Sequence, residues 1–251
     1  MTPAASEQIE GRRPVLEALR AGRAITELLV SSGSHTSGVL AEIVRLGEQQ
    51  AIPVRALPKR ELESRAQTRN PQGVIALATS FGYATLGELV EGARASGEPA
   101  LFVALDGITD PQNLGALARS TEAAGGHGLL VPQRRSAGVT PSAAKAAAGA
   151  LEHLPVAHVT NLARALEELK KEGVWIVGLD ASGGRTIYDL DVATDPVCLV
   201  VGDEGGGLSH LVRERADLVV SIPMGGRIAS LNASAAGAVA LFEIRRRRSG
   251  S

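Results

Sequence analysis

The sequence predicts an α/β protein with a small N-terminal domain and a larger C-terminal domain built on a parallel sheet. The chain has 251 residues, which is enough for two domains of ordinary size. Apolar segments of strand length alternate with helical segments along most of the chain. The strands are near-continuous runs of Val, Ile and Leu, as is typical of a parallel sheet whose two faces are covered by helices.

The first series of elements predicts an N-terminal α/β domain over residues 1–80. Its first helix lies in "GRRPVLEALRAG", where Pro14 stands in the first turn and Gly22 ends the helix. The elements expected after it are strand 25–31, helix 37–51, strand 52–57, helix 58–66 and strand 72–79. Residues 81–98 hold one helix between glycine-rich flanks, and we interpret them as a linker.

The second series predicts the larger domain over residues 99–251. In its helix 161–171, Leu162, Leu166 and Leu169 share one face, and Asn161 is expected to cap the start. The expected elements are strand 101–105, helix 113–124, strand 128–132, helix 140–149, strand 155–159, helix 161–171, strand 174–179, strand 197–202, strand 218–222 and helix 230–246.

Composition excludes some classes of protein. Aromatic residues make up 2% of the chain, which argues against a stacking platform for single-stranded nucleic acid. The net charge of −1 argues against a basic coat but allows local basic patches. The single cysteine, Cys198, cannot form an internal disulfide, and neither an 18-residue apolar stretch nor a signal pattern is present. We therefore expect a soluble cytoplasmic protein.

The candidate basic patches are Lys59, Arg60, Arg65 and Arg69, then Arg134 and Arg135, and finally Arg245 to Arg248.

Loops beyond the carboxyl ends of strands carry the ligand sites of α/β sheets, and three such loops have an unusual composition. In the first loop, the strand ends at Asp106 and the turn "DPQN" leads into a helix. We expect Asn113 to cap this helix, with Arg119 less than two turns further on. A capped helix with a surface arginine is the other interpretation of the same residues.

The second loop, "LVVGDEGGGLSH", places Asp203, Glu204 and three glycines directly after Gly202. It lacks the Gly-Lys-Ser/Thr of a P-loop and the spacing of the dinucleotide fingerprint. Its glycines allow close approach of backbone N–H groups to a ligand, and its acids favour a cationic or hydroxyl-rich one. A plain turn is the alternative.

The third loop opens the segment "SIPMGGRIASLNASAAGAVALFE" at residues 221–243. A strand runs through a glycine turn into a helix of small residues, and Ser230 and Asn232 stand at its start. These two residues either cap the helix or belong to a site. The three loops converge only if their strands are neighbours.

In order and spacing, "LDGITDPQNLGALARSTEAAG", "LVVGDEGGGLS" and "SIPMGGRIASLNASAAGAVALFE" resemble the three signature motifs of TrmH/SpoU-type 2′-O-ribose RNA methyltransferases, of the SPOUT superfamily. The resemblance covers about 150 residues, from 99 to 248. The N-terminal part, with "IEGRRPVLEALRAG" and "NPQGVIALA", is similar to the L30e-like substrate-binding domain of that family. Two departures are Ala233, where many members have valine, and Gly226–Arg227, where variable residues are usual.

The resemblance implies a fold and a cofactor. The C-terminal domain should be a SPOUT domain, a parallel sheet whose C-terminal segment threads a loop to form a trefoil knot. S-adenosylmethionine should bind in the knot, next to Gly202, Ile222, Met224 and Leu231. Family members act as homodimers, with catalytic groups near the subunit interface.

The resemblance also implies catalytic and RNA-binding residues. The catalytic set carried over from the motifs is Asn113, Arg119, Glu204, Ser230 and Asn232. Within the N-terminal domain, the candidate phosphate contacts are Arg12, Arg13, Lys59, Arg60 and Arg69. Among family members, the chain is most similar to bacterial enzymes that methylate a guanosine ribose in the peptidyl-transferase region of 23S rRNA.

Other functions remain open at this point. One is a tRNA ribose methyltransferase, although the tRNA enzymes of the superfamily carry basic extensions in place of a long N-terminal domain. Another is a non-catalytic RNA-binding or ribosome-assembly factor, and a third is a resistance enzyme that methylates an adenosine ribose. No metal site is expected, because the five histidines His35, His127, His153, His158 and His210 lack ligand spacing.

Overall fold

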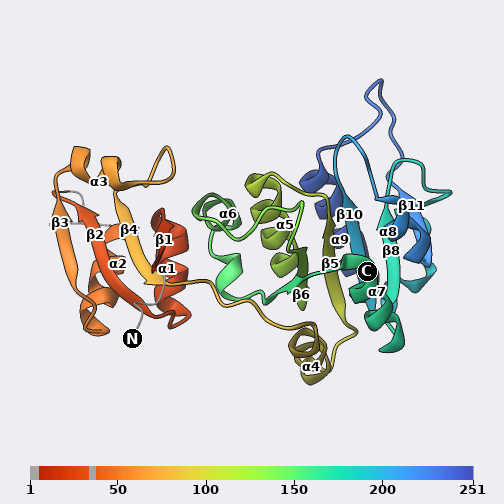
Figure 1. The fold of residues 1–251 in the computed structure, drawn as a ribbon, viewed down its shortest axis with the longest axis horizontal. Coiled ribbons are helices and arrows are strands. Elements are labelled where there is room, and N and C mark those ends of the chain that lie inside the picture. Colours follow the sequence, from red (N-terminus) through yellow and green to blue (C-terminus); the bar gives the residue numbers. More distant parts are fainter. Residues whose placement is uncertain (1–5, 34–37, 251) are drawn as a thin grey trace. The chain divides into compact units, whose positions relative to one another are not determined.

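The computed structural model describes residues 6–33 and 38–250 (Figure 1). Their contacts divide the chain into two compact units. Unit 1 comprises the chain up to Gly82 together with Val139–His153, and unit 2 comprises Tyr83–Gly138 and the chain from Leu154 on. None of the described helices is both long and apolar enough to cross a membrane.

This division differs from the expected domains in two places. Residues 139–153, expected in the second domain, pack on unit 1: α6 (Pro141–Ala147) contacts β1 and α1, and Lys145 Nζ donates to the backbone oxygen of Asn70. The expected linker belongs largely to unit 2, because α4 (Leu86–Ser96) buries Leu89 and Ala93 in the core of that unit. Neither packing surface is visible as a periodic pattern in a single sequence.

Unit 1 is built on a four-stranded mixed sheet in the order β1-β4-β2-β3. Strand β4 is antiparallel to both β1 and β2, whereas β2 and β3 are parallel. Helices α1 and α2 cover one face over a core that includes Ile9, Val15 and Ile43, and α3 covers the other through Leu62. The bounds are β1 (Ser6–Glu10), α1 (Arg12–Arg20), β2 (Ile25–Ser31), α2 (Gly38–Gln49), β3 (Val54–Leu57), α3 (Lys59–Arg65) and β4 (Val74–Thr79).

Strand β1 was not expected from the sequence. Its residues "SEQIE" contain one apolar side chain, so no alternation is visible. Glu10 at its end is fully buried, and its carboxylate accepts hydrogen bonds from Gln67 N (2.5 Å), Thr68 N (3.0 Å) and Gln8 Nε2 (2.7 Å). The buried charge thereby ties the loop before β4 to the end of β1, because a buried carboxylate needs such donors.

Unit 2 is built on a seven-stranded sheet in the order β7-β6-β5-β10-β8-β11-β9, and every pair is parallel. Five of these strands, β6, β5, β10, β8 and β11, follow one another across the unit in Figure 1. The bounds are β5 (Leu101–Asp106), β6 (Gly128–Pro132), β7 (Val156–Val159), β8 (Trp175–Leu179), β9 (Arg185–Thr186), β10 (Val197–Gly202) and β11 (Leu218–Ser221).

Helices cover both faces of the sheet, which confirms the expected α/β class. Helices α4, α7 and α8 pack over one face through a cluster that includes Leu89, Leu166 and Val212. Helices α5 and α9 pack against each other over β5 and β10 on the other face. The bounds are α5 (Pro111–Ala123), α7 (Leu162–Lys171), α8 (His210–Arg215) and α9 (Ala233–Arg248), with short 3₁₀ turns at Ala150–Glu152, Ile187–Asp189 and Asp191–Thr194.

The late strand β10 lies between β5 and β8, both earlier in the chain, and β11 lies beyond β8. This order agrees with a threaded C-terminal segment, and the trefoil knot itself stays a prediction. Cys198, in β10, is fully buried, and burial raises the pKa of its thiol, so it acts as an apolar core residue.

The arginine run at the end of α9 is not a free basic patch. Arg246 and Arg247 both pair with Glu243, at 2.9 and 2.8 Å, and their hydrogen bonds lower the pKa of that carboxyl to about 2. Arg248 donates to the carbonyl oxygens of Pro99 (2.6 Å), Ala100 (3.0 Å), Ala193 (2.9 Å) and Asp195 (2.6 Å). The guanidinium of Arg248 thus fastens the end of α9 to the segments that precede β5 and β10.

Gly237 allows the close approach of α9 to α5. A Cβ atom at this position would lie 2.3 Å from Leu117 Cδ2 and 3.4 Å from Val201 Cγ2. We therefore expect Gly237→Val to lower the free energy of unfolding by about 1–3 kcal/mol through overpacking, as measured by urea denaturation. Ala238→Val, at a partly exposed position of the same helix, is the matched control. A Gly237→Val variant as stable as the wild type would contradict this packing.

Candidate active site

The three unusual loops converge at the carboxyl edge of the sheet in unit 2. Strands β5 and β10 are adjacent, and β11, which precedes the third loop, is separated from β10 by β8 alone, so the three loops start close together at this edge. One carboxylate oxygen, Glu204 Oε1, joins all three motifs. It accepts hydrogen bonds from Asn113 Nδ2 (2.8 Å), Asn232 Nδ2 (2.5 Å) and Ala233 N (3.4 Å). Asn232 Nδ2 also donates to Asn113 Oδ1 at 2.9 Å, which closes the cluster.

Asn113 reaches this cluster from inside the first turn of α5, not from its N-cap. The N-cap is Asp110, whose side chain accepts from Gln112 N, and Pro111 occupies the first helical position. Asn113 is buried, and its amide turns toward Glu204. The expectation that Asn113 caps the helix was wrong because an Asp-Pro pair two residues earlier supplies a better start.

Asn232 has two structural tasks at the start of α9. Its Oδ1 accepts from Ser234 N (3.0 Å) and Ala235 N (3.2 Å), so it is the N-cap, while its Nδ2 binds Glu204 and Asn113. The helix therefore begins at Ala233 and not at the expected residue 230. Ser230 lies in the preceding turn, outside the helix.

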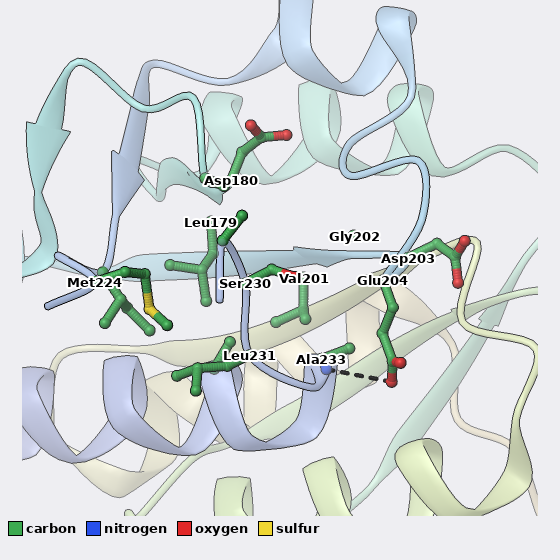
Figure 2. Close-up of a pocket in the computed structure, with 14 residues that line it drawn as sticks. Leu179, Asp180, Val201, Gly202, Asp203, Glu204, Met224, Ser230, Leu231 and Ala233 are labelled. Carbon is green, nitrogen blue, oxygen red and sulfur yellow. Dashed lines mark hydrogen bonds between the residues drawn. The ribbon is translucent and has the colours of Figure 1, made fainter. Parts of the chain in front are cut away.

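A pocket opens beside the cluster, with about 590 Å³ of space that is partly open to solvent. In Figure 2, Leu179, Met224 and Leu231 supply apolar side chains, and the Glu204 carboxylate points to the backbone of Ala233. The mixed lining suits a ligand that has both apolar and polar groups. The lining residues are Leu179, Asp180, Ala181, Val201, Gly202, Asp203, Glu204, Ile222, Met224, Ala229, Ser230, Leu231, Ala233 and Ala236.

The loop after β10 is folded back on itself at the pocket. Asp203 and Gly207 exchange two backbone hydrogen bonds of 3.1 and 2.9 Å. A Cβ atom on Gly202 would lie 2.4 Å from the carbonyl group of Gly207, so only glycine fits there. Gly207 has φ of +61°, and a Cβ on it would lie 2.5 Å from Asp180 Oδ2.

Two carboxylates at the neighbouring strand ends hold this loop in place. Asp106, at the end of β5, accepts from Ser209 N at 2.6 Å, and Asp180, just after β8, accepts from Leu208 N at 3.2 Å. Burial raises the pKa of Asp180, but hydrogen bonds from Ser182 and Leu208 and the charge of Arg213 outweigh it and lower the pKa to about 2. The carboxylate of Asp180 points away from Met224 and Leu231 in Figure 2. Asp180 therefore shapes the pocket wall by fixing the loop.

Sequence reasoning missed Asp180. The available signal was its place in "GLDASGG", directly after the predicted strand 174–179 and at the same sheet edge as the three motifs. Ala236, on α9, also lines the pocket. Enlarging Ala236 would therefore alter the pocket, whereas enlarging the adjacent Gly237 would alter the core.

The structure brings most of the expected site residues of unit 2 together. Gly202, Ile222, Met224 and Leu231 line the pocket, as do Glu204 and Ser230. Asn113 and Asn232 bind Glu204 directly. Arg119 is the exception: it is exposed on α5 and makes no hydrogen bond or ion pair with the described residues.

The expected RNA contacts of unit 1 lie along one edge of its sheet. Strands β1, β2 and β3 run in the same direction and β4 runs the opposite way, so the ends of β1 and β3 share an edge with the start of β4. The candidates at this edge are Arg12 and Arg13 after β1, Lys59 and Arg60 after β3, and Arg69 before β4, and all five are exposed. Arg12 Nε donates to Gln72 O at 3.1 Å, which links Arg12 to the loop that carries Arg69.

Metal binding has no geometric support among the described residues. Within 6–33 and 38–250, no group of three or more His, Cys, Asp or Glu side chains is arranged to hold a metal ion. His35 lies outside the described residues.

Comparison with known proteins places this geometry in a family. Residues 100–242 match the model of the SpoU rRNA methylase family, and residues 8–84 match a model described as RNA 2′-O ribose methyltransferase substrate binding. A protein of Mycolicibacterium vanbaalenii named as an uncharacterized tRNA/rRNA methyltransferase is 47% identical over 97% of this chain and 77% of its own length.

Two solved structures resemble the whole chain. The SpoU methyltransferase AviRb from Streptomyces viridochromogenes, in complex with AdoMet, has a TM-score of 0.82 at 28% identity, over 100% of this chain and 93% of its own. The AdoMet-bound rRNA methyltransferase from Sinorhizobium meliloti has a TM-score of 0.79 at 26% identity, over 96% and 87%. Because the family model matches more than half of the chain and a 47% identical relative aligns with almost all of it, the chain belongs to the SpoU rRNA methylase family.

Proposed function

We propose that this protein methylates the 2′-oxygen of a ribose in RNA with S-adenosylmethionine as the methyl donor. We propose further that the target is a guanosine in the peptidyl-transferase region of 23S rRNA. The observation that carries the proposal is the cluster of Asn113, Glu204 and Asn232 at the rim of a pocket with apolar and acidic lining. The cofactor and the rRNA substrate rest on the two AdoMet-bound structures, one of them named as an rRNA methyltransferase.

The pocket residues fit S-adenosylmethionine. Leu179, Met224 and Leu231 offer apolar surface for a purine ring, and the glycine-rich loop leaves backbone groups accessible. The carboxylates of Asp203 and Glu204 suit a ligand with cationic and hydroxyl groups. When bound, S-adenosylmethionine supplies an electrophilic methyl group on a positively charged sulfur.

The chain's own residues must align the ribose hydroxyl. Glu204 Oε1 is occupied by Asn113, Asn232 and Ala233, whereas Glu204 Oε2 accepts no hydrogen bond from the described residues. We assign Oε2 to the 2′-hydroxyl, which donates a hydrogen bond to it. As the oxygen–carbon bond forms and the methyl–sulfur bond breaks, the hydroxyl proton passes to this carboxylate oxygen. Ser230, in the pocket wall, orients the ribose from the other side. Holding the reactants in line lowers a barrier by roughly 7–11 kcal/mol, so a strong base is not required.

Arg119 is assigned to the phosphate beside the target ribose. It is exposed and has no ion pair within the described chain, so its charge is available to a ligand. A guanidinium, whose pKa is above about 12, is a poor general base. A planar guanidinium is well suited to bind phosphate through two parallel hydrogen bonds.

A homodimer is the third part of the proposal. Helix α9 exposes Ala235, Val239 and Phe242, spaced as one stripe along its outer face, and Phe242 is 50% exposed. A stripe of this kind next to the cluster suits a second copy of the chain, in line with the family. We also propose a cytoplasmic location, where an rRNA substrate is found and a free buried cysteine such as Cys198 is usual.

Two measurements on the wild-type protein test the reaction. Calorimetry is expected to show binding of S-adenosylmethionine, and methyl transfer is expected to unmodified 23S rRNA fragments but not to tRNA transcripts. Transfer to tRNA alone would replace the rRNA assignment with the tRNA alternative. Cofactor binding without transfer to either RNA would favour a non-catalytic role.

The role of Arg119 is tested by single-turnover methylation of RNA as a function of pH. We expect Arg119→Ala to slow the step by about 10²-fold, as for loss of one charge-stabilising donor. Arg119→Lys should recover part of the rate without a new ionisation, because only a positive charge is needed. The wild type is the control, and its pH profile should be flat in the same range. A new ionisation near the lysine pKa of about 10.4 in Arg119→Lys would support a general base instead.

The dimer is tested by sedimentation of Phe242→Glu. A charge at Phe242, the largest side chain of the apolar stripe, should shift the protein from dimer to monomer, because a buried unpaired carboxylate is costly. Leu211→Glu is the control, since Leu211 is similarly exposed (58%) but lies on α8, which packs on the opposite face of the sheet from α9. Dimers of unchanged stability in Phe242→Glu would place the interface elsewhere.

A further inference from the structure

Most arginines of unit 2 pair with a carboxylate, and those that do not are concentrated in one region of the unit. Arg94, Arg164 and Arg213 are typical of the paired ones, with Glu172, Glu168 and Asp180 as partners. Within the described part of unit 2, the arginines with neither a carboxylate nor a carbonyl partner are Arg119, Arg134, Arg135 and Arg227. Three of these four lie in loops at the carboxyl edge of the sheet.

Arg134 and Arg135 follow β6 and are both exposed. Their loop is fixed at both ends: Gln133 N donates to Val159 O at 2.8 Å, and Ala137 N donates to Ile108 O at 2.8 Å. Ile108 belongs to the turn that leads into α5 and to Asn113. Arg135 has φ of +58°, a conformation uncommon for residues other than glycine, which is kept mostly where the surroundings enforce it.

Arg227 lies on the opposite side of the cluster, in the turn between β11 and α9. In the strand order β6-β5-β10-β8-β11, the loop that carries Glu204 follows the middle strand. Strands are spaced about 4.8 Å apart, so the loops after β6 and β11 each start about 10 Å from the loop after β10. The loops that carry the free charges therefore start on either side of the loop that carries Glu204.

We propose that an RNA strand lies across the carboxyl edge of the sheet, with its phosphates held by Arg134 and Arg135 on one side of the cluster and by Arg227 on the other. This inference rests on the proposed function, because a ribose in a chain has a phosphate on either side of it. Guanidinium groups bind phosphate oxygens through charge-assisted hydrogen bonds. Arginines left unpaired, in a chain with net charge −1, concentrate positive potential where this polyanion must bind.

The test measures the affinity for a 23S rRNA fragment as a function of salt. The variants are Arg134→Gln with Arg135→Gln, Arg227→Gln, and all three together, since glutamine keeps much of the side-chain length and removes the charge. The slope of log affinity against log salt is expected to fall by about 0.7 for each phosphate contact on a single strand. The expected decreases are therefore about 1.4, 0.7 and 2.1. Affinity for S-adenosylmethionine in Arg134→Gln with Arg135→Gln should equal that of the wild type.

The matched control for Arg227→Gln is Lys171→Gln. It removes one positive charge from an exposed residue without an ion pair among the described residues, at the end of α7, which precedes the amino end of β8. Its slope is expected to equal that of the wild type. A control slope that falls as much as that of Arg227→Gln would mean a general charge effect and overturn the proposal.

The outcomes separate this inference from the proposed function. If the wild type methylates RNA and the variants keep its salt slope, the placement of the strand is wrong while the function stands. If the slope changes in only one of the two variants, the two-sided placement is wrong. If the wild type binds S-adenosylmethionine but methylates no RNA, the proposed function fails and this inference fails with it.

Discussion

The site depends on one carboxylate oxygen, Glu204 Oε1, which joins three segments that are far apart in the sequence. Its donors come from the first turn of α5, from the N-cap of α9 and from the backbone of Ala233. Asn232 adds to this by capping α9 with its oxygen while its nitrogen binds Glu204. The start of a helix, the end of a strand and the rim of the pocket are therefore fixed together. Loss of the shared acceptor would leave two amide groups, one of them buried, without their partner.

The arginines of unit 2 fall into two groups, those that stabilise the fold and those that are available to a ligand. The C-terminal arginines, which look like a basic tail in the sequence, bind Glu243 and the carbonyl groups before β5 and β10. Arg134, Arg135 and Arg227, in loops at the carboxyl edge, have no such partners among the described residues. A net charge of −1 thus says little about affinity for RNA, because paired arginines contribute little positive potential and unpaired ones contribute most of it.

Much of unit 2 could be predicted because its strands are strongly apolar and its motifs lie at strand ends. Strands β6 and β10 have the expected bounds, and the family resemblance identified six of the residues that line the pocket. Strand β1 could not be predicted, because its sequence is mostly polar and it is a strand only through its pairing with β4. The packing of residues 139–153 on unit 1 depends on contacts such as Lys145 with Asn70, which have no local signature. The start of α5 was predicted about one turn too late. Asp110 caps the helix and Pro111 takes its first position, so Asn113 lies inside the first turn.

The carboxylates of Asp106 and Asp180 have a consequence for ligand binding. They hold consecutive backbone N–H groups, Ser209 and Leu208, from the two strands on either side of β10. The glycine-rich loop is therefore held in one conformation by the chain's own hydrogen bonds, although its sequence suggests a flexible one. The conformational entropy of this loop is lost when the chain folds and not when the ligand arrives. Because no loop entropy is lost on binding, more of the free energy of the contacts between loop and ligand appears as affinity. A rigid loop also favours a pocket whose shape differs little between its empty and filled states.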